Sequence, residues 1–166
     1  MPSTSHSLSA SRRTLLAAGL LMGASLLPGC SMLGLSKSPA TLNATVVASA
    51  QVNPDTRKRP SPVMVRVFEL KSSTSFDQAD FVSLFEKEQA VLGADLLGRD
   101  EFVLRPGESR SVSKQLSPDT RFIGVMVGYR EIERARWRAV VPVAVGKKNE
   151  MRIDLAEIAV QALRTS

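Results

Sequence analysis

The chain is poor in the side chains that carry most enzyme chemistry. It has a single histidine, His6, and a single cysteine, Cys30, so residues 31–166 contain neither. A Ser-His-Asp triad, a Cys-His pair and a histidine-ligated zinc site therefore cannot be built from those residues. Carboxylate pairs and Ser-Lys dyads remain formally possible, but the sequence shows no motif for either and no glycine-rich phosphate loop. We therefore expect no enzymatic activity, no metal site and no cofactor.

Aromatic residues are scarce, and the apolar run near the N-terminus is short. Phe, Trp and Tyr make up 5% of the sequence, whereas surfaces that bind nucleic acid combine clustered Lys and Arg with aromatic rings. The apolar run of residues 15–27 is shorter than the roughly 20 residues that a transmembrane helix needs. The sequence therefore predicts no nucleic-acid partner and no membrane-spanning helix.

The N-terminus does contain, in order, the features of a bacterial lipoprotein leader. Arg12 and Arg13 form a positive start, residues 15–27 are apolar, and the small residue Gly29 precedes Cys30. A signal peptidase cuts beside small residues, and a cysteine thiol is the group that can carry a diacylglycerol thioether. We therefore predict that residues 1–29 are a cleaved signal peptide and that Cys30 becomes the lipidated N-terminus. The paired arginines fit either an ordinary Sec leader or a twin-arginine export signal.

Cleavage after Gly29 would leave 137 residues, which is one domain of ordinary size. The net charge falls from +6 to +4 because Arg12 and Arg13 leave with the leader. This mild positive excess suits anionic lipid headgroups or an acidic protein face. Residues 30–39 are rich in Ser, Gly and Pro and are predicted to be the lipidated tether of a folded domain at 40–166. Ser31 stands where enterobacterial lipoproteins of the inner membrane carry Asp, which favours the outer membrane.

Several short stretches after the tether alternate between polar and apolar side chains, as half-buried β-strands do. We predict strands at residues 41–52, 63–70, 109–116, 121–129 and 134–145, and a last strand that begins at Met151. Beyond Leu155 the alternation shifts, which fits either a β-bulge or a short C-terminal helix. Polar turns rich in Pro, Gly and Asn separate these strands.

One segment shows helical spacing instead. Phe81, Leu84 and Phe85 recur at i, i+3 and i+4, and Gly93 follows as a stop signal. Ser75 and Gln78 are spaced as a capping box. Together the segments predict an all-β fold, an antiparallel β-sandwich with a short helical insertion near residues 76–92.

One stretch is more specific than this general pattern. Asn53, Pro54 and Asp55 are followed by the sequence RPSPVMVRVFEL at residues 59–70. This order resembles the TssJ family, the outer-membrane lipoprotein of the type VI secretion system. Its members combine N-x-D, a short variable piece, R-P-S-P and V-x-V-R. The ADF, LF, LG and LRPGE sequences at residues 79–81, 84–85, 92–93 and 104–108 also look like this family, and the resemblance spans residues 40–160.

The resemblance implies a transthyretin-like β-sandwich with an added helical piece. It also implies a lipid anchor in the outer membrane and binding to the periplasmic C-terminal domain of TssM, and through TssM an indirect link to TssL. The loop between the first two strands is implicated in holding TssM. That loop corresponds here to Asn53, Pro54, Asp55, Thr56, Arg57, Lys58, Arg59 and Pro60, which we predict to bind the partner.

The same loop also has a purely structural explanation. Prolines fix φ, and Asn, Asp and Ser side chains bond to local backbone N–H groups. A structural role suits the prolines and Asn53, whereas partner contact suits the exposed tip at residues 55–59. Arg134, Arg136 and Arg138 likewise suit a solvated strand face, or contact with an acidic partner or lipid headgroups.

Two hypotheses about function follow. The first is a lipid-anchored adaptor that fixes a trans-envelope assembly to the outer membrane. The second is a periplasmic ligand-binding or hydrolytic lipoprotein on the same sandwich, because such folds host many functions. A solid core with a protruding loop favours the adaptor, whereas a deep cleft lined by two carboxylates favours the enzyme.

Overall fold

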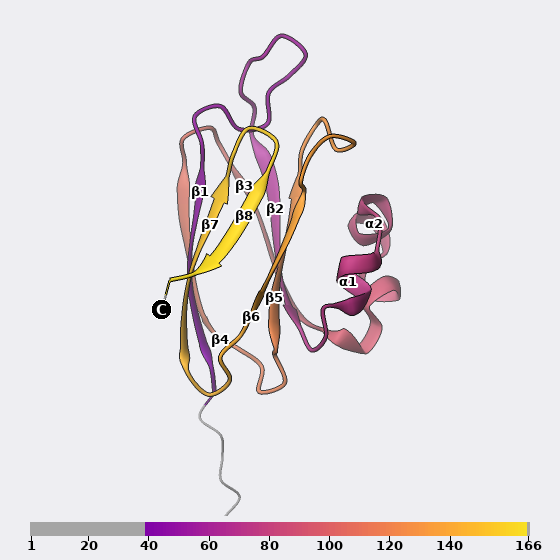
Figure 1. Ribbon diagram of the computed structural model, residues 1–166, viewed down its shortest axis with the longest axis vertical. Helices are drawn as coiled ribbons and strands as arrows, with labels where there is room; N and C mark the ends of the chain where they lie inside the picture. Colours follow the sequence, from indigo (N-terminus) through magenta and orange to yellow (C-terminus); the bar gives the residue numbers. More distant parts are fainter. Residues whose placement is uncertain (1–38, 166) are drawn as a thin grey trace, which may run out of the picture. The chain divides into compact units, whose positions relative to one another are not determined.

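A computed structural model describes residues 39–165; the predicted signal peptide, Cys30 and nearly all of the tether lie outside them. Within the described residues, eight strands form two four-stranded sheets packed face to face (Figure 1). The first sheet has the order β4 (Ser109–Gln115), β1 (Thr41–Ala48), β7 (Lys148–Leu155) and β8 (Val160–Arg164). The second has the order β3 (Leu96–Leu104), β2 (Val63–Leu70), β5 (Phe122–Gly128) and β6 (Arg138–Pro142). The predicted β-sandwich is confirmed.

The core between the sheets follows from the two-residue period of the strands. On β1, Leu42, Val46 and the residues of the same parity are buried, while Thr45 is exposed on the other face. The inward rows of β2, β5 and β7 complete this apolar layer. The strands pair antiparallel except for β1 and β7, which are parallel, so the expectation of a wholly antiparallel sandwich is wrong at this one pair.

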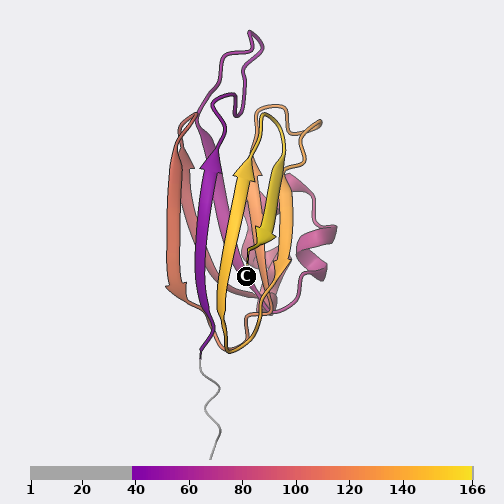
Figure 2. The ribbon, with the colours of Figure 1, turned by 60° about the vertical axis from the view of Figure 1, so that its left-hand side comes forward.

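The helical insertion consists of α1 (Thr74–Gln78), α2 (Phe81–Leu92) and the 3-10 turn η1 (Gly93–Asp95). It covers the outer face of the second sheet (Figures 1 and 2) and encloses a second apolar cluster. The fully buried side chains of this cluster include Phe68, Phe76 and Leu84. Strand β2 therefore packs on both faces, which explains why its last six residues are all buried.

The ends of the helices differ in part from the prediction. The expected capping box at Ser75 is wrong, because α1 has Ser73 at its N-cap position without a side-chain hydrogen bond. The cap belongs to α2, where the Asp80 carboxylate accepts the Ser83 backbone N–H at 2.9 Å. The expected stop at Gly93 is confirmed: its φ of 53° lies in the left-handed region that glycine tolerates best.

The strand boundaries also depart from the sequence pattern. Strand β3 was not predicted, and β1 ends at Ala48 instead of residue 52. The predicted strand at residues 134–145 shrinks to β6, because Arg134 belongs to a turn, Arg136 bridges Ala159 and not β5, and residues 143–145 lead into the next turn. At the C-terminus the shifted alternation belongs to β8, a strand paired with β7, and no helix forms within the described residues there.

Four connections meet at one end of the sandwich: residues 49–62, 105–108, 129–137 and 156–159. The first of them protrudes furthest (Figure 1). Strand β1 begins at the opposite end, so the start of the described chain and the protruding loop lie at the two ends of the long axis (Figures 1 and 2). No helix in residues 39–165 has both the length and the apolar character needed to cross a bilayer.

Candidate functional site

The loop at residues 53–62 is fastened at its base by Asn53. This residue is only 3% exposed and has a left-handed φ of 52°, a conformation that asparagine adopts more readily than most residues. Its amide Nδ2 donates to the Pro62 carbonyl at 2.7 Å, and its Oδ1 accepts the Arg130 N–H at 2.7 Å. Its own N–H donates to the Glu157 carbonyl at 2.9 Å. Asn53 therefore joins both stems of the loop to two neighbouring connections.

The tip of the loop is organised by Asp55. Its Oδ1 accepts the backbone N–H groups of Arg57 and Arg59 at 2.8 and 3.0 Å, and its Oδ2 pairs with the Arg59 guanidinium at 2.7 Å. The Lys58 N–H closes the turn on the Asp55 carbonyl at 2.9 Å. The backbone hydrogen bond from Arg59, followed by its side chain, lowers the pKa of Asp55 although partial desolvation opposes this. The tip is thus ordered by its own contacts.

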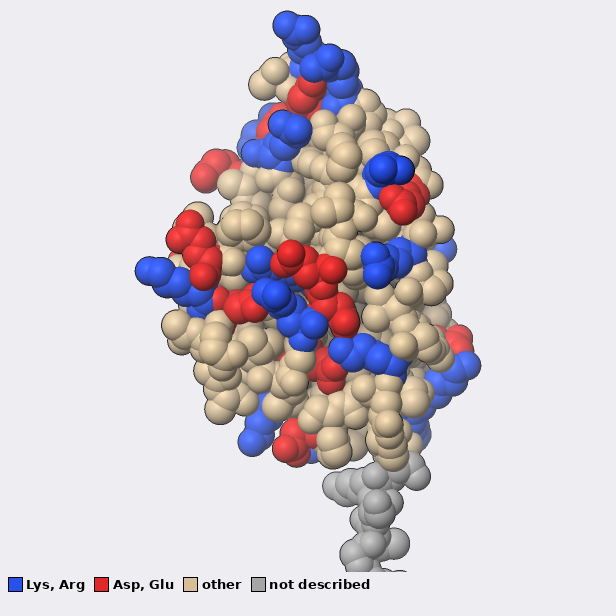
Figure 3. Space-filling view, turned by 180° about the vertical axis from the view of Figure 1, so that it is seen from behind, with Lys and Arg blue, Asp and Glu red and all other residues tan. Residues whose placement is uncertain are grey.

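The predicted partner-binding residues divide into two groups by exposure. Asn53 and Pro54 are buried and Asp55 is half-buried, so these three support the loop. Residues 56–60 are all exposed. Within the described chain Arg57 and Lys58 form no salt bridge, and Arg59 pairs only inside the loop. Cationic side chains therefore gather at the protruding end of the molecule (Figure 3).

The connection at residues 129–137 lies beside the loop. Its Arg130 and Glu131, with Pro54, Asp55 and Thr56, line a small cavity of about 200 Å³. The three arginines expected on one strand face are separated here. Arg134 lies in the turn and pairs with Glu131 at 2.8 Å, whereas the Arg138 guanidinium donates to the Phe76 and Ala79 carbonyls at 3.0 and 2.6 Å.

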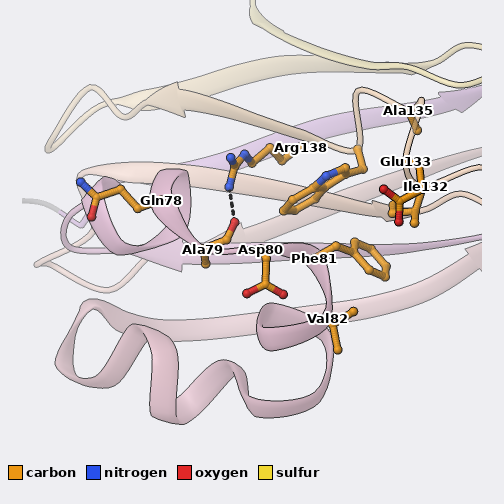
Figure 4. A pocket seen from close by; sticks show the side chains of 10 residues that line it. Gln78, Ala79, Asp80, Phe81, Val82, Ile132, Glu133, Ala135 and Arg138 are labelled. Carbon is orange, nitrogen blue, oxygen red and sulfur yellow. Dashed lines mark hydrogen bonds between the residues drawn. The ribbon is translucent and has the colours of Figure 1, made fainter.

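A larger open groove of about 580 Å³ lies between the helical insertion and the same connection (Figure 4). Its lining includes two carboxylates, Asp80 and Glu133. Hydrogen bonds from the Ser83 hydroxyl and N–H lower the pKa of Asp80, so this carboxylate stays ionised as a helix cap. A carboxyl group that serves as a general acid instead needs a raised pKa. Residues 39–165 also contain no group of three or more potential ligands that could hold a metal ion.

The role assigned to Asp55 makes a testable prediction. We expect Asp55→Ala to speed tryptic cleavage after Arg57 and Lys58, because both N–H bonds and the ion pair that order the tip are lost. Asp119→Ala, which removes an exposed carboxylate from a different turn, should leave the cleavage rate unchanged. Equal rates in both variants would contradict the ordering role.

The same carboxylate predicts a pH dependence. A lowered pKa stabilises the folded tip above the ordinary value of 3.8, and this stabilisation is lost as the pH falls through the lower folded value. The amide signals of Arg57 and Arg59 should therefore move together in NMR spectra, with a midpoint below the ordinary pKa of 3.8. A midpoint at or above the ordinary value would contradict the hydrogen-bonded arrangement.

Comparison with known proteins identifies the family of this fold. A family model described as type VI secretion lipoproteins, including VasD, EvfM and TssJ, matches residues 40–158. The chain belongs to the TssJ family. The crystal structure of the type VI secretion lipoprotein TssJ1 from Pseudomonas aeruginosa is 34% identical, with a TM-score of 0.75 over 77% of this chain and 98% of that one. The predicted family resemblance is thus confirmed.

Other solved structures agree with this TssJ-family membership. Lip from Serratia marcescens, a membrane-bound component of the type VI secretion system, is 28% identical, with a TM-score of 0.69 over 74% of this chain and 96% of that one. A chain in the structure of the TssM C-terminal domain from EAEC is 26% identical, with a TM-score of 0.60 over 74% of this chain and 97% of that one. No match was found among curated proteins.

Proposed function

We propose that this TssJ-family lipoprotein is an adaptor that tethers the type VI membrane complex to the outer membrane. Lipid on Cys30 would hold it at the periplasmic face, and the 53–62 loop would bind the periplasmic C-terminal domain of TssM. TssL would be linked only indirectly, through TssM. The observation that carries this proposal is the protruding, internally braced and cationic loop at the end opposite the start of β1.

The predicted anchor agrees with this geometry. Each buried CH₂ of an acyl chain contributes about 0.8 kcal/mol, and two or more chains give stable membrane attachment. A random coil of nine residues, the length from Ser31 to Pro39, spans about 15–18 Å on average. Since the folded domain begins at the end opposite the loop, a tether of this length would keep the domain near the bilayer with the loop turned towards the periplasm.

The loop itself indicates the chemistry of the partner surface. Arg57 and Lys58 project from an ordered turn, so little backbone conformational entropy remains to be lost when a partner binds. Their charges favour an acidic patch on the partner, which would also speed the encounter. The similarity to a chain in the structure of a TssM C-terminal domain supports TssM as that partner.

Adaptor function requires no catalysis. The ligand-binding or hydrolytic alternative needs a cleft with converging polar groups. The groove of Figure 4 is open, and one of its two carboxylates is engaged as the cap of α2. We therefore propose a binding role and not an enzymatic one.

The proposal predicts a local charge effect on binding. Reversing both tip charges, Arg57→Glu with Lys58→Glu, should weaken binding to the periplasmic domain of the cognate TssM at least about tenfold, equivalent to about 1.4 kcal/mol. The matched control, Lys147→Glu with Lys148→Glu, changes the net charge equally at the opposite end, where Lys148 pairs with Thr41 at the start of β1, and should bind like the wild type. Calorimetry measures all three proteins.

Each alternative result has a distinct meaning. Equal weakening in both double variants would show that net charge, and not the loop, governs binding. Unchanged binding in both would move the interface away from the loop. If the folded wild type does not bind the TssM domain, the adaptor proposal is wrong and the ligand-binding alternative takes its place.

A further inference from the structure

The groove of Figure 4 is lined by apolar side chains that pack on the core from one side and are partly buried there. Its floor contains Phe81 and Trp137, whose rings meet edge to face with centroids 5.3 Å apart. At its lip Val82 is 58% exposed, although it belongs to the first turn of α2. Ile132 and Ala135 form the facing wall, on the connection between β5 and β6 (Figure 4).

Within the described chain, the acidic side chains around this floor have no cationic partner, although Asp80 accepts two hydrogen bonds from Ser83. Within residues 39–165 neither Asp80 nor Glu133 takes part in a salt bridge. The one cation in the lining, Arg138, is already engaged: it donates to the Phe76 and Ala79 carbonyls and lies 4.7 Å from the Trp137 ring centre. An apolar floor with acidic edges is complementary to an apolar side chain next to a Lys or Arg.

The groove is continuous with the loop that we propose as the docking site. The connection at residues 129–137 supplies Arg130 and Glu131 to the cavity beside the loop, and it supplies Ile132, Glu133 and Ala135 to the groove. A partner seated on the loop therefore reaches the groove across a single turn of chain. The loop presents positive charge and the groove negative charge, so the two surfaces select different parts of that partner.

We propose that the groove is a second docking site for the same partner protein. It takes an extended segment of that protein in which an apolar side chain inserts beside Phe81 and a neighbouring Lys or Arg approaches Asp80 and Glu133. This inference rests on the proposed adaptor function. The opposite charges of loop and groove would fix the orientation of the partner on the sandwich.

The experiment compares two valines of equal exposure. Val82→Lys places a cation in the groove, whereas Val103→Lys makes the same change on β3, outside the groove; both valines are 58% exposed. The full-length lipoprotein in detergent is titrated with the periplasmic domain of the cognate TssM. We expect at least fivefold weaker binding for Val82→Lys and less than twofold change for Val103→Lys. Glu133→Lys should weaken binding like Val82→Lys.

A photo-crosslinking residue at position 82 or 103 provides an independent readout. Position 82 should crosslink to one segment of the TssM domain that contains an apolar residue beside a Lys or Arg, and position 103 should not. Wild-type affinity for Val82→Lys and Glu133→Lys, or crosslinking to an acidic segment, overturns the groove proposal. If the Arg57/Lys58 double variant still loses binding in that case, the adaptor function stands. A wild type that fails to bind the TssM domain overturns both.

Discussion

Replacing Phe76 by alanine is expected to lower the free energy of unfolding by about 3–5 kcal/mol. The ring is fully buried between α1 and the outer face of the second sheet, where it lies 5.6 Å from the Phe68 ring. It also lies above Gly124: a Cβ atom on that residue would be 3.1 Å from the Phe76 ring. Glycine has no side chain that could move into the space, so truncation leaves a cavity. Urea denaturation measures the loss.

The control for Phe76 is a phenylalanine in the same insertion that is not buried. Phe85 is 44% exposed, stacks on Phe81 and lies 4.7 Å from the Arg66 guanidinium. Phe85→Ala should cost about 1 kcal/mol, the usual scale of an exposed cation–π contact. Equal losses in the two variants would show that the insertion does not pack on the sheet through α1. The folded fraction of Phe76→Ala should keep the 53–62 loop intact, because Asn53 fastens that loop at the far end of the sandwich.

The sequence predicted strands well where one face of the strand is buried and the other is exposed to solvent. Strand β1 is such a case, and its alternation is visible directly in residues 41–48. Strand β3 was missed because it carries Arg99, Asp100 and Glu101 in its middle and lies at a sheet edge. Its centre is held by partners far along the chain: β2 pairs with it antiparallel, Arg66 of β2 pairs with Glu101, and Lys114 of β4 pairs with Asp100 at 2.7 Å. No local pattern encodes a partner that far along the chain.

The predicted strand at residues 134–145 failed for a related reason. Alternating Arg and apolar residues at 134–139 mimic a strand, yet only Arg138 onwards pairs with β5. The ring of Trp137 is held by Phe81 of the insertion, and Arg138 by carbonyls at the end of α1. Arg136 instead exchanges backbone hydrogen bonds with Ile158 and Val160, so this segment is arranged by partners from three different parts of the fold. Their spacing alone therefore could not separate a strand from a turn followed by a short strand.

The position of the candidate loop along the chain could be predicted from the sequence, but the roles of its individual residues could not. The N-P-D and R-P-S-P motifs located the loop at residues 53–62, and residues 56–60 are exposed there. The burial of Asn53 depends on bonds to Pro62 and to Arg130, which is 77 positions away. The groove beside Trp137 could not be foreseen, because it forms only where the insertion meets the connection between β5 and β6. The one local signal of Asn53's role was an asparagine before proline at a turn.

Arg66, the arginine of the V-x-V-R motif, carries the second large prediction. Its side chain is 10% exposed beneath α2 and pairs with both Glu88 and Glu101. The guanidinium also donates to the Phe85 carbonyl at 2.8 Å, just before Lys87, where α2 leaves helical geometry with φ −136° and ψ 36°. Arg66→Leu should therefore lower the free energy of unfolding by about 2–4 kcal/mol, because two carboxylates and a carbonyl lose their shared donor.

Arg99 gives a matched control, because it pairs with the same Glu88 at 2.6 Å but is 39% exposed. Arg99→Leu should cost at most about 1 kcal/mol, as exposed ion pairs do. Arg66→Lys should fall between the two, since an ammonium keeps the charge but cannot reproduce the planar fork of a guanidinium. Hydrogen exchange should localise the loss to α2, while the 53–62 loop stays protected. If Arg66→Leu costs no more than Arg99→Leu, the insertion is held by its apolar face alone, and the Phe76 cluster then accounts for all of its attachment.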